Sequence, residues 1–232
     1  MHLPTIATRV IRKSLGNRIP LGWRLPLEYY LYRGGADCEP ELKWLEEICP
    51  RRGVAIDVGA NIGVYSYKMA KLFPQVYCFE INPDLLGPLE ALGSARISVI
   101  AKGLSAEAGK MTLHIPVVNR LPLTGWASLQ RGNCPDTDEH IEKAVEVATL
   151  DSYNLPNVCL IKIDVEGHEL EVLTGAERTL TKYRPVVIAE VKEKNRPAVK
   201  QFFARFNYRQ LTLDDLVGVI GAPENFIFLP QI

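Results

Sequence analysis

The 232-residue sequence lacks an excess of charge of either sign, a long apolar run and a patterned set of cysteines. Its 27 Lys and Arg residues balance 27 Asp and Glu residues, so no global basic field indicates a nucleic-acid partner. No apolar stretch has the length of a transmembrane helix, and the N-terminus lacks the continuous apolar core of a signal peptide. The composition is otherwise ordinary for a soluble globular enzyme.

The five cysteines give no indication of a zinc site or of a disulfide framework. They are odd in number and show neither a C-x-x-C pair nor zinc-ligand spacing. Cys78 and Cys159 fall in predicted buried strands, so we expect reduced core thiols and a cytoplasmic location. The five are Cys38, Cys49, Cys78, Cys134 and Cys159.

Residues 54–63, reading V-A-I-D-V-G-A-N-I-G, predict a buried strand, a tight turn and the start of a helix. Gly59 allows the sharp turn and admits a ligand close to the backbone. Gly63 lets the next helix begin close to the strand, with its free N–H groups directed at the turn. The stretch therefore predicts a site for a polar or charged small molecule.

A second strand, 75–80, ends on Glu80, at the position where an acidic residue can hold ribose hydroxyls. A dinucleotide site needs G-x-G-x-x-G, but Asp57 replaces the first glycine here. A carboxylate repels a pyrophosphate and suits a cationic ligand with an amino group, such as S-adenosylmethionine. The alternative is an unrelated strand–helix unit whose glycines serve only packing.

The rest of the chain alternates predicted strands and helices, which indicates an α/β fold with a mostly parallel sheet covered on both faces. Further strands are predicted at 96–101, 110–115, 145–150, 158–164, 185–191, 208–211 and 225–229. An irregular stretch is predicted from the end of the strand 110–115 up to residue 142. Helices are predicted at 39–49, 64–73, 82–92, 169–180 and 196–206. Ligands bind beyond the carboxyl ends of such strands, so one cleft should contain Asp57, Glu80, Gly103–Ser105, Asp164 and Glu190.

The first 35 residues differ from the rest, because six basic residues stand against the single acid Glu28. The basic residues are Arg9, Arg12, Lys13, Arg18, Arg24 and Arg33. We expect residues 1–50 to form an N-terminal, mainly helical extension that packs on the main domain, 51–232. A weak membrane-surface contact, a lid over the active site and a homo-oligomer contact are the alternatives.

Five motifs occur in a characteristic order: D-V-G-A-N-I-G-V-Y-S (57–66), F-E-I-N-P (79–83), G-L-S (103–105), T-L-D (149–151) and I-K-I-D-V-E-G-H-E-L-E-V-L-T-G-A (161–176). Together they resemble the FkbM family of S-adenosylmethionine-dependent methyltransferases from about residue 53 to residue 191. The resemblance implies a Rossmann-like class I sheet of seven strands with its last strand antiparallel. It also implies O-methylation of a hydroxyl on a sugar, glycolipid or secondary metabolite. The family commonly has F-E-P-N-P where this chain carries Ile81.

The resemblance and the strand-end pattern together assign an S-adenosylmethionine site. Glu80 should accept hydrogen bonds from both ribose hydroxyls, and Asp57 should meet the amino group of the methionine part. Ile81 and Leu104 should enclose the adenine, whose edge Ser105 should reach. The full set of expected cofactor residues is Asp57, Gly59, Ala60, Asn61, Gly63, Glu80, Ile81, Asn82, Leu104, Ser105 and Asp164.

Asp164 and His168 are the candidate catalytic residues. Asp164 should align the acceptor or the sulfonium end of the cofactor, and His168 is a candidate base for an alcohol proton. The alternative for His168 is a capping or surface residue at a helix start, where Glu166 and Glu169 are expected as favourable acids. Asp164, Glu166 and His168 could instead hold a metal, but the turn at Gly167 breaks their common face, so we expect none.

Residues 119–140 and the N-terminal extension should supply the acceptor pocket for a small molecule or glycan. Trp126 could stack on a sugar ring there, beside Arg120 and Arg131, or could only fill an irregular loop. The sequence does not indicate what His114 and His140 contact, and we expect both to be structural or exposed. A non-catalytic nucleotide- or partner-binding module and N- or protein methylation remain open, whereas Asp57 argues against an NAD-dependent oxidoreductase.

Overall fold

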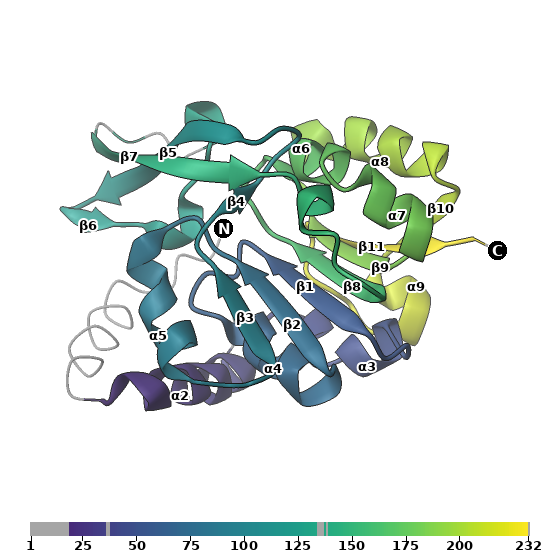
Figure 1. Cartoon of the computed structure of the whole chain (residues 1–232), viewed down its shortest axis with the longest axis horizontal. Coiled ribbons are helices and arrows are strands. Elements are labelled where there is room, and N and C mark those ends of the chain that lie inside the picture. Colours follow the sequence, from purple (N-terminus) through teal and green to yellow (C-terminus); the bar gives the residue numbers. More distant parts are fainter. Residues whose placement is uncertain (1–18, 36–37, 134–136, 138, 232) are drawn as a thin grey trace.

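The computed structural model describes residues 19–35, 38–133, 137 and 139–231 (Figure 1). In this part of the chain, seven strands form one sheet in the order β10-β11-β9-β8-β1-β2-β3. Their bounds are β1 Val54–Val58, β2 Gln75–Phe79, β3 Ile97–Ile100, β8 Val158–Ile163, β9 Val186–Glu190, β10 Tyr208–Leu211 and β11 Asn225–Pro230. Only β11 pairs antiparallel with its neighbours, β9 and β10. The predicted mostly parallel sheet with an antiparallel last strand is confirmed.

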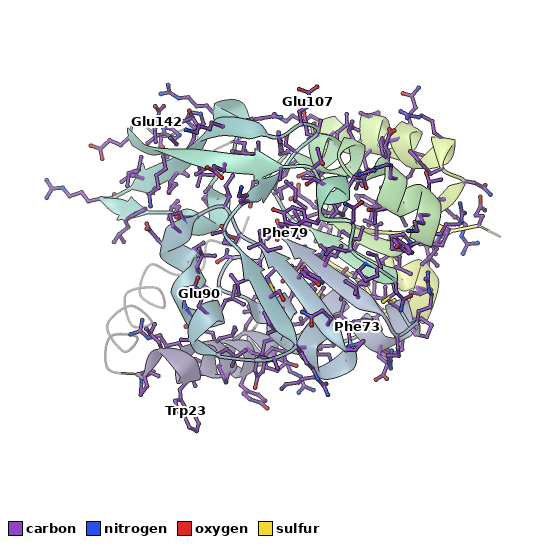
Figure 2. The ribbon with its side chains drawn as sticks, in the orientation of Figure 1. Trp23, Phe73, Phe79, Glu90, Glu107 and Glu142 are labelled. Atoms are coloured by element: carbon purple, nitrogen blue, oxygen red, sulfur yellow. The ribbon has the colours of Figure 1, made fainter. Side chains whose placement is uncertain are left out.

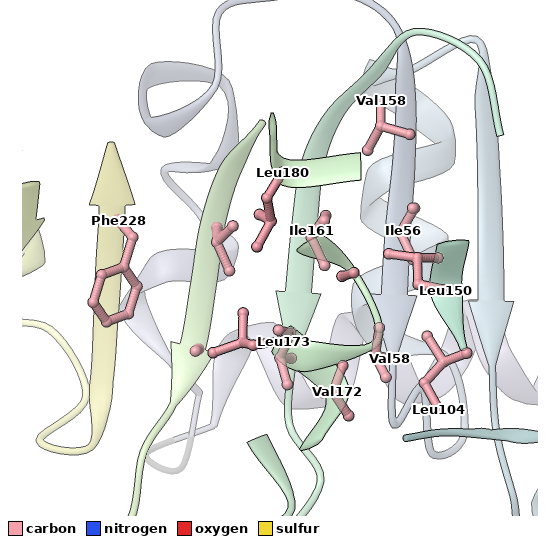
Figure 3. Packing of buried hydrophobic residues seen from close by; sticks show 14 of the residues in the cluster. Ile56, Val58, Leu104, Leu150, Val158, Ile161, Val172, Leu173, Leu180 and Phe228 are labelled. Carbon is pink, nitrogen blue, oxygen red and sulfur yellow. The ribbon is translucent and has the colours of Figure 1, made fainter. Parts of the chain in front are cut away.

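Helices cover both faces of this sheet because its central strands are apolar on both sides. On one face lie α6 (Glu169–Thr174), α7 (Glu177–Tyr183) and α8 (Arg196–Arg205). On the other lie α2 (Leu21–Gly34), α3 (Leu45–Ile48), α4 (Val64–Leu72), α5 (Leu86–Ala91) and α9 (Leu213–Val217). Figure 3 shows Val172 and Leu173 of α6 packed near Val58 of β1 and Ile161 of β8.

A smaller sheet stands over the carboxyl ends of β2 and β3 (Figure 1). It consists of β4 (Gly103–Leu104), β7 (Glu139–Ala148), β5 (Gly109–Val118) and β6 (Leu121–Pro122). The predicted strands 110–115 and 145–150 belong to it. The predicted irregular stretch up to residue 142 is wrong at its two ends, because β5 continues to Val118 and β7 begins at Glu139, and it also contains β6. Charged residues along the exposed face of β7 concealed its alternation in the sequence. The buried side of the sheet packs against Ile81.

The predicted helix 169–180 is in fact two helices, α6 and α7. At Gly175, a Cβ atom would lie 2.1 Å from the backbone oxygen of Ser105, so the helix breaks where another chain segment passes. Asp151, from the T-L-D motif, then accepts hydrogen bonds from the backbone N–H groups of Arg178 and Thr179 in the first turn of α7. The predicted helix 39–49 is likewise divided into a 3-10 turn, Pro40–Leu42, and α3.

The described part of the N-terminal extension packs on the main domain through α2, which contacts the helices α4 and α5. Leu25 and Tyr29 are buried on this side of α2. The basic residues Arg9, Arg12, Lys13 and Arg18 lie outside the described residues. In the ranges that the structure describes, no helix combines the length and apolarity needed to cross a bilayer.

Candidate active site

The turn after β1 is held against the ends of two neighbouring strands. Gly59 has φ +78°, and a Cβ atom there would lie 1.8 Å from the backbone oxygen of Asp164, so only glycine fits. The N–H groups of Gly59 and Ala60 donate to the carbonyl of Phe79 at 2.9 and 3.1 Å. Gly63, with φ +92°, begins α4 directly against Leu89. The predicted strand, turn and helix start are therefore present.

Glu80 lies beside this turn with a side chain that is nearly buried. Its Oε2 accepts a hydrogen bond from the backbone N–H of Asn61 and its Oε1 from that of Asn82, each at 2.7 Å. Burial raises the pKa of Glu80 to about 7 despite these bonds. Each carboxylate oxygen keeps a further lone pair, so the group can still accept two hydroxyl donors from a ligand.

An open cleft lies between the ends of the central strands and the smaller sheet. Its apolar wall comprises Phe79, Ile81, Leu85, Leu104, Leu113, Ala127 and Leu129, and Figure 2 shows Phe79 at the end of β2. Its polar wall includes Asn61, Glu80, Thr124, Asp164, Glu166 and His168. The cleft thus joins an apolar half to a half rich in carboxylates.

Five expected cofactor residues do not line the cleft: Asp57, Ala60, Gly63, Asn82 and Ser105. Asp57 is buried beneath α4, where the Ser66 hydroxyl donates to its Oδ2, and burial raises its pKa to about 6. The Asn82 side chain accepts from the backbone N–H of Asp84 at 3.2 Å and so begins the turn after β2. The hydroxyl of Ser105 lies against a histidine ring.

That ring belongs to His168, whose Nε2 lies 3.0 Å from Ser105 Oγ. Its Nδ1 lies 3.7 Å from Glu171 Oε2. His168 is 3 % exposed, and burial lowers its pKa although Glu171 acts to raise it, so the imidazole is neutral at neutral pH. It occupies the N-cap position of α6 without a side-chain cap hydrogen bond and lines the cleft, so the alternative of a surface or capping histidine was wrong.

The two glutamates near His168 differ in their surroundings. Glu169 accepts from the backbone N–H of Gly167 at 2.6 Å and from Asn195 at 3.1 Å within the first turn of α6. Glu166 precedes the helix with φ +50°, lines the cleft and lies 3.1 Å from Lys192 Nζ. Burial raises the pKa of Glu166 to about 8. Glu169 is a helix-start acid, whereas Glu166 faces the cleft.

Asp164 belongs to an acidic group that sequence reasoning did not assemble. In the described ranges, the His, Cys, Asp and Glu residues close enough to share one ion are Glu39, Asp164 and Glu190, with one oxygen of each within 4.8 Å of the others. The alternative set with Glu166 and His168 is therefore not brought together. Burial raises the pKa of Asp164 to about 7. Lys162, whose charge interrupts an apolar strand, was the available signal for this group.

The expected acceptor segment contributes to the cleft in part. Thr124, Gly125, Ala127 and Leu129 line the cleft, whereas Trp126 is half-buried and is not among the lining residues. Arg120 and Arg131 are exposed. His114 Nδ1 lies 3.3 Å from Glu142 Oε1, and His140 is half-buried on β7. Residues 134–136 and 138, including Cys134, lie outside the described residues.

Three characterised relatives share sequence with this chain. Methyltransferase sdnD of Sordaria araneosa is 33% identical over 163 residues, covering 55% of this chain and 62% of the relative. The 2-O-methyltransferase NoeI of Sinorhizobium fredii is 26% identical over 158 residues, covering 56% and 60%. Hexuronic acid methyltransferase AglP of Haloferax volcanii is 29% identical over 155 residues, covering 63% and 59%. The chain thus spans about three fifths of the length of these relatives.

Solved structures show the same fold. An FkbM methyltransferase from Methylobacillus flagellatus superimposes with a TM-score of 0.51 and 16% identity, covering 94% of this chain and 57% of that chain. The protein SMU.1697c of Streptococcus mutans, solved with SAH, gives 0.50 and 13%, covering 82% and 96%. The profile of the Methyltransferase FkbM domain matches residues 57–210, from the end of β1 to β10. This chain is a member of the FkbM family of methyltransferases.

Proposed function

We propose that the protein transfers a methyl group from S-adenosylmethionine to a hydroxyl group of a small molecule or glycan. The observation that carries this proposal is the pairing of Glu80 with the Gly59 turn at the polar end of an otherwise apolar cleft. A carboxylate for ribose hydroxyls, a close backbone approach and an apolar wall for adenine fit the cofactor. The names of two relatives, a 2-O-methyltransferase and a hexuronic acid methyltransferase, support a hydroxylated acceptor.

Several residues of the chain would bind the cofactor. Glu80 would hold the ribose, Ile81 and Leu104 would enclose the adenine, and the Gly59 turn would lie against the methionine part. Bound S-adenosylmethionine supplies an electrophilic methyl group on a sulfonium, so the protein needs mainly to align the acceptor and accept its proton. Asp164 and the neutral imidazole of His168 both line the cleft and could accept that proton.

Calorimetry of S-adenosylmethionine binding tests the cofactor assignment. We expect the wild type to bind and Glu80→Gln to bind about a hundredfold more weakly, because charge-assisted hydrogen bonds to two hydroxyls are weakened. Glu90→Gln, which changes an exposed acid on α5, is the matched control and should bind like the wild type. Equal affinities for all three proteins would refute the role of Glu80, and no binding to the folded wild type would refute the cofactor. Mass spectrometry of products from hydroxyl and amine acceptors would separate O-methylation from N- or protein methylation.

We further propose that α2 contacts an anionic membrane surface. Trp23, Leu27, Tyr30 and Leu31 lie on one stripe of α2, opposite the buried Leu25 and Tyr29, and are 40 to 71 % exposed. Figure 2 shows Trp23 directed away from the body of the protein. Residues 1–18, which precede α2, carry four basic and no acidic residues in the sequence. Exposed aromatic residues that follow a basic segment in the sequence fit the interface of an anionic bilayer.

Co-sedimentation with vesicles tests this contact. The wild type should bind vesicles of phosphatidylserine and phosphatidylcholine more than pure phosphatidylcholine vesicles, and Trp23→Ser with Leu31→Ser should reduce binding about tenfold. Ile220→Ser removes an isolated exposed side chain and is the control. Equal sedimentation of all variants refutes the membrane contact. A concentration-dependent dimer that the α2 variants dissociate would assign the stripe to a homo-oligomer instead.

A cytoplasmic location remains a proposal that the cysteines support. Cys38, Cys49, Cys78 and Cys159 are free in the structure, and the last three are buried. Reduced thiols favour a reducing compartment. Titration of the denatured protein, purified without reductant, should therefore find all five thiols free, and a missing pair would contradict the proposal.

A further inference from the structure

A half-buried group of charged residues lies at the carboxyl ends of β8 and β9, beside the cleft. Lys162 lies in β8, Asp164 directly follows the end of β8, and Glu190 is the last residue of β9. Glu39, from the segment between α2 and α3, completes the group. The three carboxylate side chains are 21 to 32 % exposed, so a ligand can approach them from solvent. We call these four residues the acid–lysine cluster.

The environment of Glu39 fixes its position in this cluster. The hydroxyl of Tyr65 and the side-chain amide of Asn225 both donate to Glu39 Oε2 at 2.7 Å. Tyr32 donates to Oε1 at 3.3 Å. Although burial acts to raise the pKa of Glu39, the Lys162 ammonium and these hydrogen bonds lower it, so Glu39 is ionised. The cluster is therefore preorganised in the absence of a ligand.

Lys162 points to the kind of ligand that the cluster accepts. Its side chain is 1 % exposed, and its Nζ lies 3.5 Å from Asp164 Oδ2 and 4.0 Å from Glu39 Oε2. Nζ makes no hydrogen bond within the described residues. A buried ammonium already supplies a positive charge between the carboxylates, so a metal ion would be repelled from this position. Three carboxylates that surround a buried ammonium group suit a neutral ligand that donates hydrogen bonds, such as a molecule with neighbouring hydroxyl groups.

Asp164 connects the cluster with the cleft, because it belongs to the cluster and also lines the cleft. Glu190 is held in turn by Lys192, whose Nζ lies 2.8 Å from Glu190 Oε1 and 3.0 Å from Glu224 Oε2. A molecule bound at the cluster would therefore present an oxygen next to the ligand in the cleft. No other described carboxylate is shared by the two regions.

We propose that the acid–lysine cluster is the acceptor subsite and recognises a polyol through two neighbouring hydroxyls, with Asp164 taking the proton of the hydroxyl that is methylated. This inference rests on the proposed function. The acceptor oxygen bonds to the methyl carbon, the carbon–sulfur bond breaks with its electron pair left on sulfur, and the hydroxyl proton passes to the Asp164 carboxylate. Glu39 and Glu190 bind the acceptor, and Lys162 is a positioning residue that holds Glu39 and Asp164.

Saturation-transfer NMR on the SAH-bound protein tests the subsite without requiring turnover. The probes are methyl pyranosides of neutral hexoses and of hexuronic acids, together with their 3-deoxy analogues, which have no two neighbouring ring hydroxyls. We expect wild-type protein to bind at least one glycoside and to bind its deoxy analogue about tenfold more weakly. Glu190→Gln should weaken glycoside binding about tenfold and leave the affinity for SAH unchanged. Glu193→Gln, three residues further and exposed, is the matched control.

The other possible outcomes would refute either the acceptor subsite or the proposed function on which it rests. Wild-type affinity in Glu190→Gln, or no signal from any glycoside while SAH is bound, would exclude the subsite and leave the cofactor site standing. Failure of SAH to bind the wild type would instead refute the proposed function. Calorimetric binding of Mg²⁺ or Mn²⁺ that Glu190→Gln abolishes would assign the cluster to a metal.

Lys162→Met provides a second test that separates positioning from simple loss of structure. Without the ammonium, Asp164 should hold its proton to higher pH, so the acidic limb of the pH profile for glycoside binding should move upward. An unchanged profile in a folded Lys162→Met variant would contradict the role of Lys162. If this variant fails to fold, Glu190→Gln still decides the proposal.

Discussion

Replacement of Glu80 by glutamine should change how stability depends on pH, because this buried carboxyl titrates at a raised pKa. Burial moves the pKa of Glu80 from its usual 4.5 to about 7 in the folded protein. Between these two values the folded state binds more protons than the unfolded state, so stability falls as pH rises. A difference of about 2.5 units corresponds to about 3 kcal/mol lost across this window. Glutamine does not titrate, so the variant lacks this loss.

The decisive quantity is the difference in unfolding free energy between wild type and Glu80→Gln, measured by urea titration at about pH 5 and about pH 8. The glutamine amide faces a backbone N–H and loses a hydrogen bond, at a cost of about 1 to 3 kcal/mol at both pH values, so this cost cancels. Other carboxyl groups with a raised pKa, such as Asp57, titrate in both proteins, so their contributions to the difference in unfolding free energy cancel as well. We expect glutamine to become more favourable by about 3 kcal/mol at the higher pH. A difference that stays constant within about 1 kcal/mol would refute the reasoning.

Two further predictions concern residues that shape the site. Gly59→Ala should lower the unfolding free energy by about 3 kcal/mol or more, because a Cβ atom meets a backbone oxygen at positive φ, whereas Gly93→Ala, also at positive φ but in open space, should cost about 1 kcal/mol in the same urea titration. Equal losses would contradict the steric argument. The ring of His168 should titrate below its usual value of 6.5 in NMR spectra, because burial lowers its pKa, and Ser105→Ala should destabilise the protein by about 1 kcal/mol. A midpoint at or above 6.5 would exclude the buried, neutral imidazole.

The sequence predicted the central strands well because their apolar runs and flanking glycines carry local information. Residues 54–58 and 208–211 were predicted with the bounds that β1 and β10 have. The helix 169–180 and the irregular stretch before residue 142 were mispredicted for a common reason. A passing backbone decides the break at Gly175, and a partner strand decides the start of β7, and neither is visible in a local window.

The features of the candidate site likewise fall into those determined by residues close in the chain and those determined by tertiary packing. The sequence by itself determined the Gly59 turn, the position of Glu80 after β2 and the motif order of the FkbM family, because positive-φ glycines and strand-end acids depend on residues close in the chain. Only the tertiary structure turned Asp57 beneath α4 and Ser105 toward His168, since the pleat of a strand and the packing of its covering helices decide where a side chain points. Tertiary structure alone also brought Glu39 to Lys162 and Asp164, because Glu39 lies more than a hundred residues away in the sequence and reaches them only when the N-terminal segment folds across the sheet.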